Sequence, residues 1–302
     1  HLAFGRISGA ARNARFLKVG TAVRTPFFSG YTTIMPSNRA AQTLLQSFPV
    51  PEYLSEPAIG CDISDHAVRY VELTRGKRGL RMLRSGTERF PEGVIVSGDI
   101  RDQQAAAEVL RTLQADGGIP VAHFSLPIEK TFLFHVDIPG LDLDPSAVRS
   151  VCEFKLEENL PIAPQEALFD CIELAENRET ATTDVSVAAV ARATVADYLT
   201  LFEAAGIEPL SLEVESDAVA RAVVPQGTDD TVMVVDFGAR KTGLSIARRG
   251  SVVFTSGLDF GSDHLTDAVA KGLSLARGEA EALKRKTGLT PVRGDRRVFT
   301  VL

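Results

Sequence analysis

Two aspartates, each at the end of a short apolar run, carry the clearest chemical signal in the sequence. Asp62 is followed by Ser64 and Asp236 by Gly238, so each acid begins a tight turn. A glycine in such a turn lets backbone N–H groups approach a phosphate closely. The carboxylate can hold a hydrated Mg²⁺ through water, as proteins usually bind this ion. Two such turns could clamp phosphates and a metal between them; alternatively, each acid merely caps its turn.

The same order of elements surrounds both aspartates. An apolar strand, an Asp-x-Ser or Asp-x-Gly turn, a strand, a hairpin, a third strand and a helix are predicted at 58–113 and again from 231 to 269. Asp102 is the expected N-cap of the first helix and Ser262 that of the second. The second aspartate follows the first by 174 positions. This repetition predicts two related α/β halves.

A stretch with no counterpart in the repeat lies between the two copies. Asp144 and Pro145 predict the start of a helix there, because aspartate is a good N-cap and proline suits the first turn. The strands expected around this helix are 121–126, 132–138, 167–174 and 185–191.

The first half resumes after this stretch. Thr194 and Asp197 predict a capping-box start for a helix that Gly206 ends. A strand at 207–214 and a short helix at 217–223 follow. Together they return the chain to the first half before the second begins.

Charge is distributed unevenly along the chain. Six of the 33 basic residues and none of the 39 acidic residues fall in the first 50 positions, so the rest carries a net charge of −12. An acidic body argues against nucleic acid as the partner. Residues 1–34 have the composition of a targeting segment or precede a natural start at Met35, and we expect the latter.

Several other classes of protein and site are disfavoured. No run approaches the roughly 18 to 20 apolar residues that a membrane span needs. The three cysteines have unrelated spacings, which predicts neither a disulfide framework nor a zinc site. Neither a nucleophile elbow nor a Walker A loop occurs. No catalytic residue is assigned.

Two phosphate hairpins in this order resemble the actin/FtsA/Hsp70 superfamily, which includes sugar kinases. Within it the chain resembles the PilM family of type IV pilus assembly proteins from about Met35 to about Leu289. The matching segments are 47–54, 60–64, 158–162, 234–240, 260–266 and 279–286.

The resemblance implies a nucleotide site for ATP and Mg²⁺. It assigns Asp62 and Asp236 to the metal, through water, and Glu281 and Lys284 to the ribose and adenine. Ser64 stands where many members of the superfamily have glycine. The residues implied in the two phosphate loops and near the nucleotide are Asp62, Ile63, Ser64, Asp236, Gly238, Ala239, Arg240, Thr242, Gly261 and Ser262.

The resemblance also implies an α/β, actin-like fold of two RNase H-like halves, with an inserted 1C subdomain of the FtsA (SHS2-like) type. The closing part of the second half is expected to be missing. The predicted division is a leader at 1–34, a helix and linker at 35–55, subdomain 1A at 56–127 and 192–225, subdomain 1C at 128–191, and subdomain 2A with the start of 2B at 226–302.

The implied function is a cytoplasmic scaffold at the inner face of the cytoplasmic membrane. Members of the family bind the cytoplasmic tail of PilN, an inner-membrane protein, between subdomains 1A and 1C. ATP hydrolysis would be slow at most, and self-association is an option. The alternatives are an FtsA-like division protein, a sugar-kinase-type phosphotransferase, and a pseudo-ATPase that acts only as an interaction module, which Ser64 favours.

Overall fold

The computed structural model describes residues 58–76, 79–115, 118–225, 230–248 and 251–288, and residues 298 and 300. These residues fall into two units, His1–Ala218 and Val219–Leu302. The predicted leader at 1–34 and the helix and linker at 35–55 lie outside the described residues.

A five-stranded sheet in the order β10-β6-β1-β2-β3 organises the first unit. β1 (Ala58–Ile63), β2 (Ala67–Gly76) and β3 (Gly79–Arg89) are antiparallel neighbours. β6 (Val121–Leu126) and β10 (Glu208–Val214) continue the sheet in parallel with β1. The ends of these three parallel strands therefore meet at one edge of the sheet.

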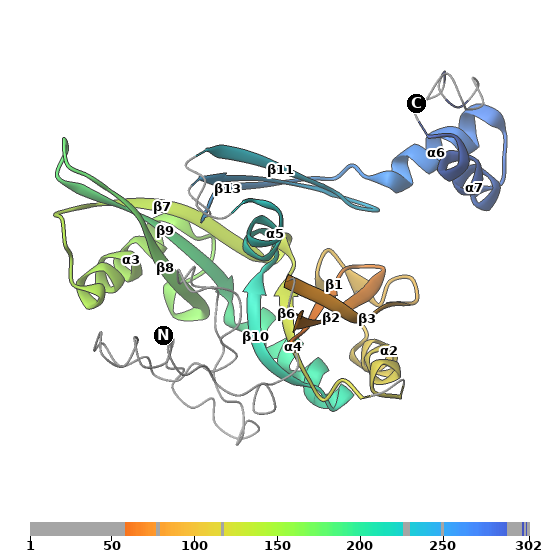
Figure 1. Cartoon of the computed structure of the whole chain (residues 1–302), viewed down its shortest axis with the longest axis horizontal. Helices are drawn as coiled ribbons and strands as arrows, with labels where there is room; N and C mark the ends of the chain where they lie inside the picture. The colour runs from red at the N-terminus through yellow and green to blue at the C-terminus, as the bar shows by residue number, and fades with distance from the viewer. Residues whose placement is uncertain are drawn as a thin grey trace. The chain divides into compact units, whose positions relative to one another are not determined.

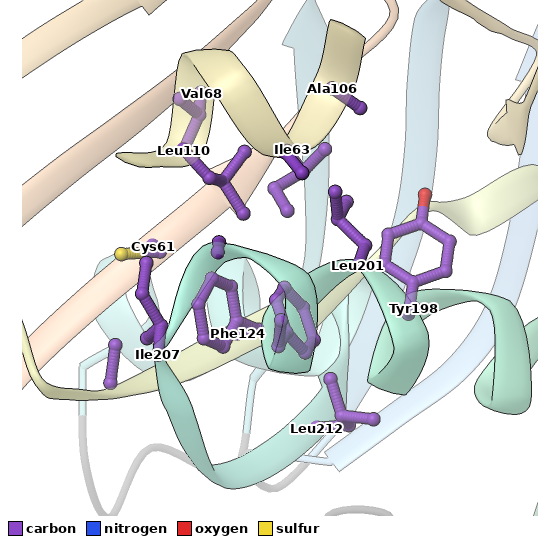
Figure 2. Close-up of a cluster of buried hydrophobic side chains, with 14 of the residues drawn as sticks. Cys61, Ile63, Val68, Ala106, Leu110, Phe124, Tyr198, Leu201, Ile207 and Leu212 are labelled. Carbon is purple, nitrogen blue, oxygen red and sulfur yellow. The ribbon is translucent and has the colours of Figure 1, made fainter. Parts of the chain in front are cut away.

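Two helices pack against this sheet, α2 (Gln103–Ala115) and α4 (Arg192–Ala205). Their apolar stripes meet the strand side chains in one core, where Phe124 stacks on Phe202 with ring centroids 3.9 Å apart (Figure 2). Close packing of this kind makes each core side chain sensitive to truncation. A short ribbon of β4 (Ile95–Val96) and β5 (Asp99–Ile100) precedes α2.

A second sheet of the same unit is antiparallel, in the order β7-β9-β8. It comprises β7 (Thr131–Pro139), β8 (Ala167–Asn177) and β9 (Thr182–Ala191), with α3 (Pro145–Asn159) packed against it (Figure 1). Short 3-10 turns at Ile128–Lys130 and Pro164–Glu166 lead into β7 and β8. The strands and helix predicted between the two copies are thus present.

Some helix ends in the first unit lie where the sequence predicts them. Asp102 and Asp144 accept backbone N–H bonds from Ala105 and Ser146 at 3.0 and 2.8 Å, as N-caps do. Gly206 ends α4 in the left-handed conformation, with φ of 74°.

The capping-box start of α4 at Thr194 is wrong. The helix begins two residues earlier, directly after β9, and its N-cap Ala191 makes no side-chain bond. The strand itself delivers the chain into the first helical turn, so no capping side chain fixes the boundary.

The second unit begins within α5 (Glu215–Val223), since its boundary follows Ala218. An antiparallel sheet of β11 (Thr231–Phe237), β12 (Thr242–Arg248) and β13 (Ser251–Leu258) follows. Then come α6 (Ser262–Leu273) and α7 (Arg277–Thr287), which share a small apolar core around Val269 and Ala280.

Ser262 is not the N-cap of α6, contrary to the prediction. Gly261 holds that position and Ser262 is the first helical residue. The three strands and the helix otherwise recur in the predicted order, but the first copy has the short β4–β5 ribbon inserted before its helix. None of the helices in the described part of the chain is long and apolar enough to cross a membrane.

Candidate functional site

The first turn presents a carboxylate that the sheet holds in place. Asp62 lies at the end of β1, where Ser125 Oγ of β6 donates to its Oδ1 at 3.0 Å. Arg69 Nη1 of β2 lies 3.4 Å from its Oδ2, and the Asp62 side chain is 43% exposed. The carboxylate is thus oriented and partly neutralised, yet still open to water and to a hydrated cation.

The residues after Asp62 have different surroundings. The Ile63 side chain is buried in the core, so only its backbone could meet a ligand. The Ser64 N–H and hydroxyl both donate to the Ala67 carbonyl at 3.0 Å. Ser64 therefore closes the turn itself.

The second turn, from Gly238 to Lys241, is joined to the start of α6. The Gly238 N–H donates to the Lys241 carbonyl at 2.9 Å. The first two N–H groups of α6 donate outward to the same turn: Ser262 to the Gly238 carbonyl at 3.0 Å and Asp263 to the Ala239 carbonyl at 2.8 Å. These contacts satisfy helix N–H groups that otherwise have no partner.

Glycine is required where the turn meets the helix. A Cβ on Gly261 would lie 2.6 Å from the Ala239 carbonyl oxygen, and one on Gly238 would lie 2.8 Å from that of Lys241. Both glycines are thus explained by close backbone packing. Thr242 is buried, and its hydroxyl donates to the Phe260 carbonyl at 2.6 Å, which fixes the far side of the turn.

Two members of the predicted site are exposed on the second turn and the strand before it. The Asp236 carboxylate is exposed at the end of β11 and makes no hydrogen bond or ion pair with the described residues. Arg240, at the tip of the turn, is also exposed. The second turn therefore offers an open acid beside a structured backbone.

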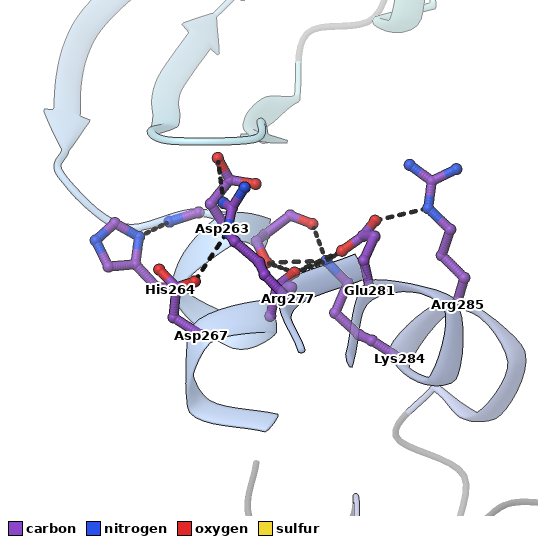
Figure 3. Close-up of polar contacts among 10 residues, drawn as sticks. Asp263, His264, Asp267, Arg277, Glu281, Lys284 and Arg285 are labelled. Atoms are coloured by element: carbon purple, nitrogen blue, oxygen red, sulfur yellow. Dashed lines mark hydrogen bonds and ion pairs between the residues drawn. The ribbon is translucent and has the colours of Figure 1, made fainter. Parts of the chain in front are cut away.

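A buried lysine ties α6 to α7 (Figure 3). Lys284, whose side chain is 11% exposed, donates from Nζ to the Ser262 carbonyl at 2.9 Å and to the Ser262 hydroxyl at 2.6 Å. It also lies 2.6 Å from Glu281 Oε2. An ammonium with this many acceptors holds the first turn of α6 against α7.

Glu281 is the anionic centre of this network. Hydrogen bonds from Lys284, Thr266 and Arg285 lower the pKa of Glu281 to about 2. Glu281 therefore stays ionised whenever these partners hold it. The Glu281 and Lys284 side chains bind each other and the helix start, with Lys284 Nζ on Ser262 Oγ.

The structure thus groups the predicted residues into two sets. Gly238, Ala239, Gly261, Ser262 and Lys284 form one continuous hydrogen-bonded assembly, which also includes Glu281. Asp236, Arg240 and Thr242 belong to the same hairpin. Asp62, Ile63 and Ser64 form a separate turn in the other unit.

Sequence reasoning missed two residues at the edge that carries Asp62. Ser125 of β6 orients the Asp62 carboxylate, and Glu215, after β10, accepts the Ile128 N–H on its Oε2 at 3.2 Å. The parallel order β10-β6-β1 brings them to one edge of the sheet. The alternation of parallel strands with helices was the available signal, because ligands bind at such edges.

A pocket of about 200 Å³ lies elsewhere in the first unit, at the start of β8. Leu168 belongs to the core of the five-stranded sheet, whereas Ala167 and Phe169 belong to the core of the three-stranded sheet. Charged groups face the pocket, and the Arg149 guanidinium lies 4.4 Å from the Phe169 ring centroid. The lining comprises Arg149, Glu153, Pro164, Gln165, Ala167, Leu168, Phe169 and Arg192.

The fold defines the class of protein: a mixed α/β protein of the actin-like type, as predicted. A solved PilM–PilN type IV pilus biogenesis complex has a chain that is 23% identical, with a TM-score of 0.63; the match covers 76% of this chain and 69% of that chain. The subdomain boundaries within this fold remain predictions.

Two further structures are more distant. EutJ, an ethanolamine utilization protein from Carboxydothermus hydrogenoformans, is 18% identical with a TM-score of 0.47, covering 84% of this chain and 67% of that chain. MreB5 of Spiroplasma citri bound to ADP is 12% identical with a TM-score of 0.42, covering 77% of this chain and 63% of that chain.

The model of the type IV pilus assembly protein PilM family matches residues 60–297. The chain belongs to this family. The resemblance noted in the sequence is thereby confirmed.

Proposed function

We propose that this chain is a nucleotide-binding scaffold of type IV pilus assembly that binds the cytoplasmic tail of a PilN-like inner-membrane protein. Such binding would hold it at the inner face of the cytoplasmic membrane. The observation that carries the proposal is the pocket lined by α3, the start of β8 and Arg192 of α4. The similar solved complex contains PilM and PilN, which supports a partner of this kind.

The pocket has the chemistry of a peptide site. Arg149 and Arg192 are donors that suit peptide carbonyls, and Glu153 is an acceptor for peptide N–H groups. Leu168 and Phe169 add an apolar wall for a side chain. An extended segment with one apolar anchor meets both requirements.

The neighbouring strand strengthens this argument. Among the described residues β8 lies at the edge of its sheet, whose order is β7-β9-β8. Its outer backbone groups can pair with an extended chain, as in strand-addition complexes. The pocket lies at the start of this strand, so one tail could use both features.

The test measures binding of a fluorescent peptide from the cytoplasmic tail of the PilN-like protein by anisotropy, using full-length protein. Arg149→Ala should weaken binding about tenfold, because a charged donor in the pocket is lost. The matched control is Arg101→Ala, since Arg101 is exposed, pairs with Asp99, and does not line the pocket. Wild-type affinity in Arg149→Ala would overturn this site.

We further propose that the two turns bind ATP with Mg²⁺. The exposed Asp236 and the oriented Asp62 suit a hydrated cation held through water. Gly238, Ala239, Arg240 and Thr242 would face the phosphates in the second turn, and Ile63 and Ser64 in the first. Glu281 and Lys284 would reach the ribose and adenine, and Gly261 and Ser262 would lie near the nucleotide.

The backbone of the second turn is preorganised for binding phosphates. Its carbonyls are already engaged by α6, so its conformation is set before a ligand arrives. The metal would neutralise phosphate charge when bound. The chain itself would bind and orient the phosphates, and hydrolysis would be slow at most.

Isothermal titration of full-length protein with ATP and Mg²⁺ tests this site. Asp236→Ala should weaken binding sharply, by about tenfold or more, because the open carboxylate is lost. Asp259→Ala is the control, since that carboxylate is 91% exposed and lies near the same turn. Equal affinity of Asp236→Ala and the control would overturn the assignment.

The two alternative functions predict different behaviour. An FtsA-like protein would polymerise, and a sugar-kinase-type enzyme would consume ATP only with a small acceptor. The PilM family match favours neither. Self-association of the scaffold remains part of the proposal, and sedimentation with and without ATP would measure it.

A further inference from the structure

The end of the β2–β3 hairpin exposes large apolar side chains. Leu80, Met82 and Leu83 of β3 are 48%, 59% and 49% exposed. The buried side chains of the first unit lie in its cores instead, and these three belong to none of them. A cluster of this kind on a surface marks an interaction site more often than isolated apolar residues do.

The geometry of the hairpin brings these side chains together. β3 is the edge strand of its sheet, and beyond Leu73 the described part of the sheet contains only β2 and β3. A register shift leaves Leu83 unpaired between Met82, the partner of Leu73, and Arg84, the partner of Glu72. Such a bulge bends the strand and re-aims a side chain, while Leu80 and Met82 share a face by strand alternation.

The charge of the same segment is opposite to that of the protein. Between Glu72 and Glu88 there are five basic residues and no acid, whereas the whole chain has a net charge of −6. The five are Arg75, Lys77, Arg78, Arg81 and Arg84. Lys77 and Arg78 lie outside the described residues.

Some of the basic side chains form ion pairs and others do not. Arg84 forms an ion pair with Glu72, and Arg69 one with Asp62, nearer the centre of the sheet. Arg81 is exposed and makes no ion pair with the described residues. Positive charge without a carboxylate partner is therefore found where the apolar side chains are exposed.

We propose that this hairpin end binds the surface of a bilayer that contains anionic phospholipid. Leu80, Met82 and Leu83 would enter the boundary between head groups and acyl chains, and Arg81 would meet the lipid phosphates. Long basic side chains suit this position because the stem stays in the apolar zone while the head group reaches the phosphates.

A bilayer fits this surface better than a rigid protein partner does. Three apolar side chains at the end of a narrow ribbon bury little area against a flat protein surface, far below the roughly 1,200 Å² of a stable interface. A fluid head-group layer closes around such a projection. The local positive charge also offsets the repulsion between an acidic protein and an anionic membrane.

This inference goes beyond the PilN-tail proposal and does not depend on it. A single shallow contact of this size gives weak, reversible membrane binding. If a tethered partner holds the chain nearby, the same contact becomes effectively intramolecular and strengthens the whole attachment.

The absence of tryptophan from the sequence permits a direct test. Met82→Trp introduces a single indole at the proposed contact, and Phe154→Trp introduces one at an exposed position of α3, where Phe154 is 73% exposed. Full-length protein is titrated with vesicles of phosphatidylglycerol and phosphatidylcholine, and with vesicles of phosphatidylcholine alone. We expect a blue shift of emission only for Met82→Trp and only with phosphatidylglycerol.

Charge dependence is tested in the same assay. Arg81→Gln in the Met82→Trp background should reduce affinity for the anionic vesicles about fivefold, as expected for one basic residue near the surface. Raised salt should weaken binding in the same direction.

Three outcomes would overturn the proposal. The first is unchanged Met82→Trp emission with anionic vesicles while circular dichroism shows a folded protein. The second is an equal shift in Phe154→Trp. The third is a shift that follows protein concentration without vesicles, which would make the hairpin end a contact between copies of the chain. Loss of PilN-tail binding would affect none of these readouts.

Discussion

The strands around Asp62 and those around Asp236 begin with the same three-stranded antiparallel arrangement and differ in what surrounds it. β1 has β2 on one side and β6 on the other, and its Ile59, Cys61 and Ile63 are at most 4% exposed. β11 pairs with β12 and with no second strand among the described residues. Its Met233 and Val235 are 65% and 56% exposed.

This difference separates two contributions to the fold. Local sequence specifies the strand, the turn and the hairpin, because both copies form them. Burial comes from further elements: β6 and β10, which follow the first copy, extend its sheet, and α2 and α4 cover it. The two copies should therefore respond differently to the same kinds of substitution.

The largest expected effect is in the first core. Phe124→Ala should lower the free energy of unfolding of the first unit by about 3–5 kcal/mol, because it empties a fully packed site and removes the stack on Phe202. Val235→Ala in the second copy should change stability by less than about 0.5 kcal/mol. Urea unfolding followed by circular dichroism measures both, and equal losses would contradict the contrast.

Next in size is the contact between the second turn and α6. Gly261→Ala should destabilise the second unit by about 1–3 kcal/mol, since its Cβ would collide with the Ala239 backbone. Gly257→Ala is the matched control, because a Cβ added there would meet no other atom within 4 Å. Hydrogen exchange of the Ser262 amide reports the local loss, and protection equal to that of the control would contradict it.

A smaller effect depends on pH. The pKa of Glu281 falls from 4.5 to about 2 on folding, so its ionised form stabilises the folded chain above pH 4.5 and this stabilisation is lost as pH falls toward 2. Solvent screening near the surface limits it to about 1 kcal/mol. Glu281→Gln should remove this part of the pH dependence in thermal unfolding, whereas Glu108→Gln on α2 should leave it unchanged.

The smallest expected effect concerns the ion pair with Arg69, which Asp62 has and Asp236 lacks among the described residues. Arg69→Ala leaves Asp62 without its exposed ion pair and should cost at most about 0.5 kcal/mol. Unfolding by urea measures this, and a loss above about 1 kcal/mol would show that Arg69 fixes the first turn structurally. A small loss would make Asp62 resemble the open Asp236 more closely.

The sequence predicted what local signals determine. Strand alternation located the elements, and Asp102, Asp144 and Gly206 marked helix ends through caps that involve neighbours in the chain. Thr194 and Ser262 failed as starts because tertiary connections supply what a capping side chain would. α4 continues directly from β9, and the first N–H groups of α6 donate to the turn at Gly238.

The candidate site was predictable in its residue types more than in its contacts. The aspartate turns and the Glu281–Lys284 spacing are visible in the sequence. The buried position of Lys284, the support of Asp62 by Ser125 and the pocket beside Arg149 arise from residues far apart in the chain. The assignment of the two aspartate turns to ATP and Mg²⁺ stays a prediction that the Asp236→Ala titration tests.

The bonds between the second turn and α6 have a mechanical consequence. Ser262 and Asp263 anchor the helix to the carbonyls of Gly238 and Ala239, while Lys284 clamps α7 to the same first turn. A tilt of the α6–α7 pair must carry the turn with it or break these bonds. The position of α6 and the backbone that follows Asp236 are therefore coupled through these bonds.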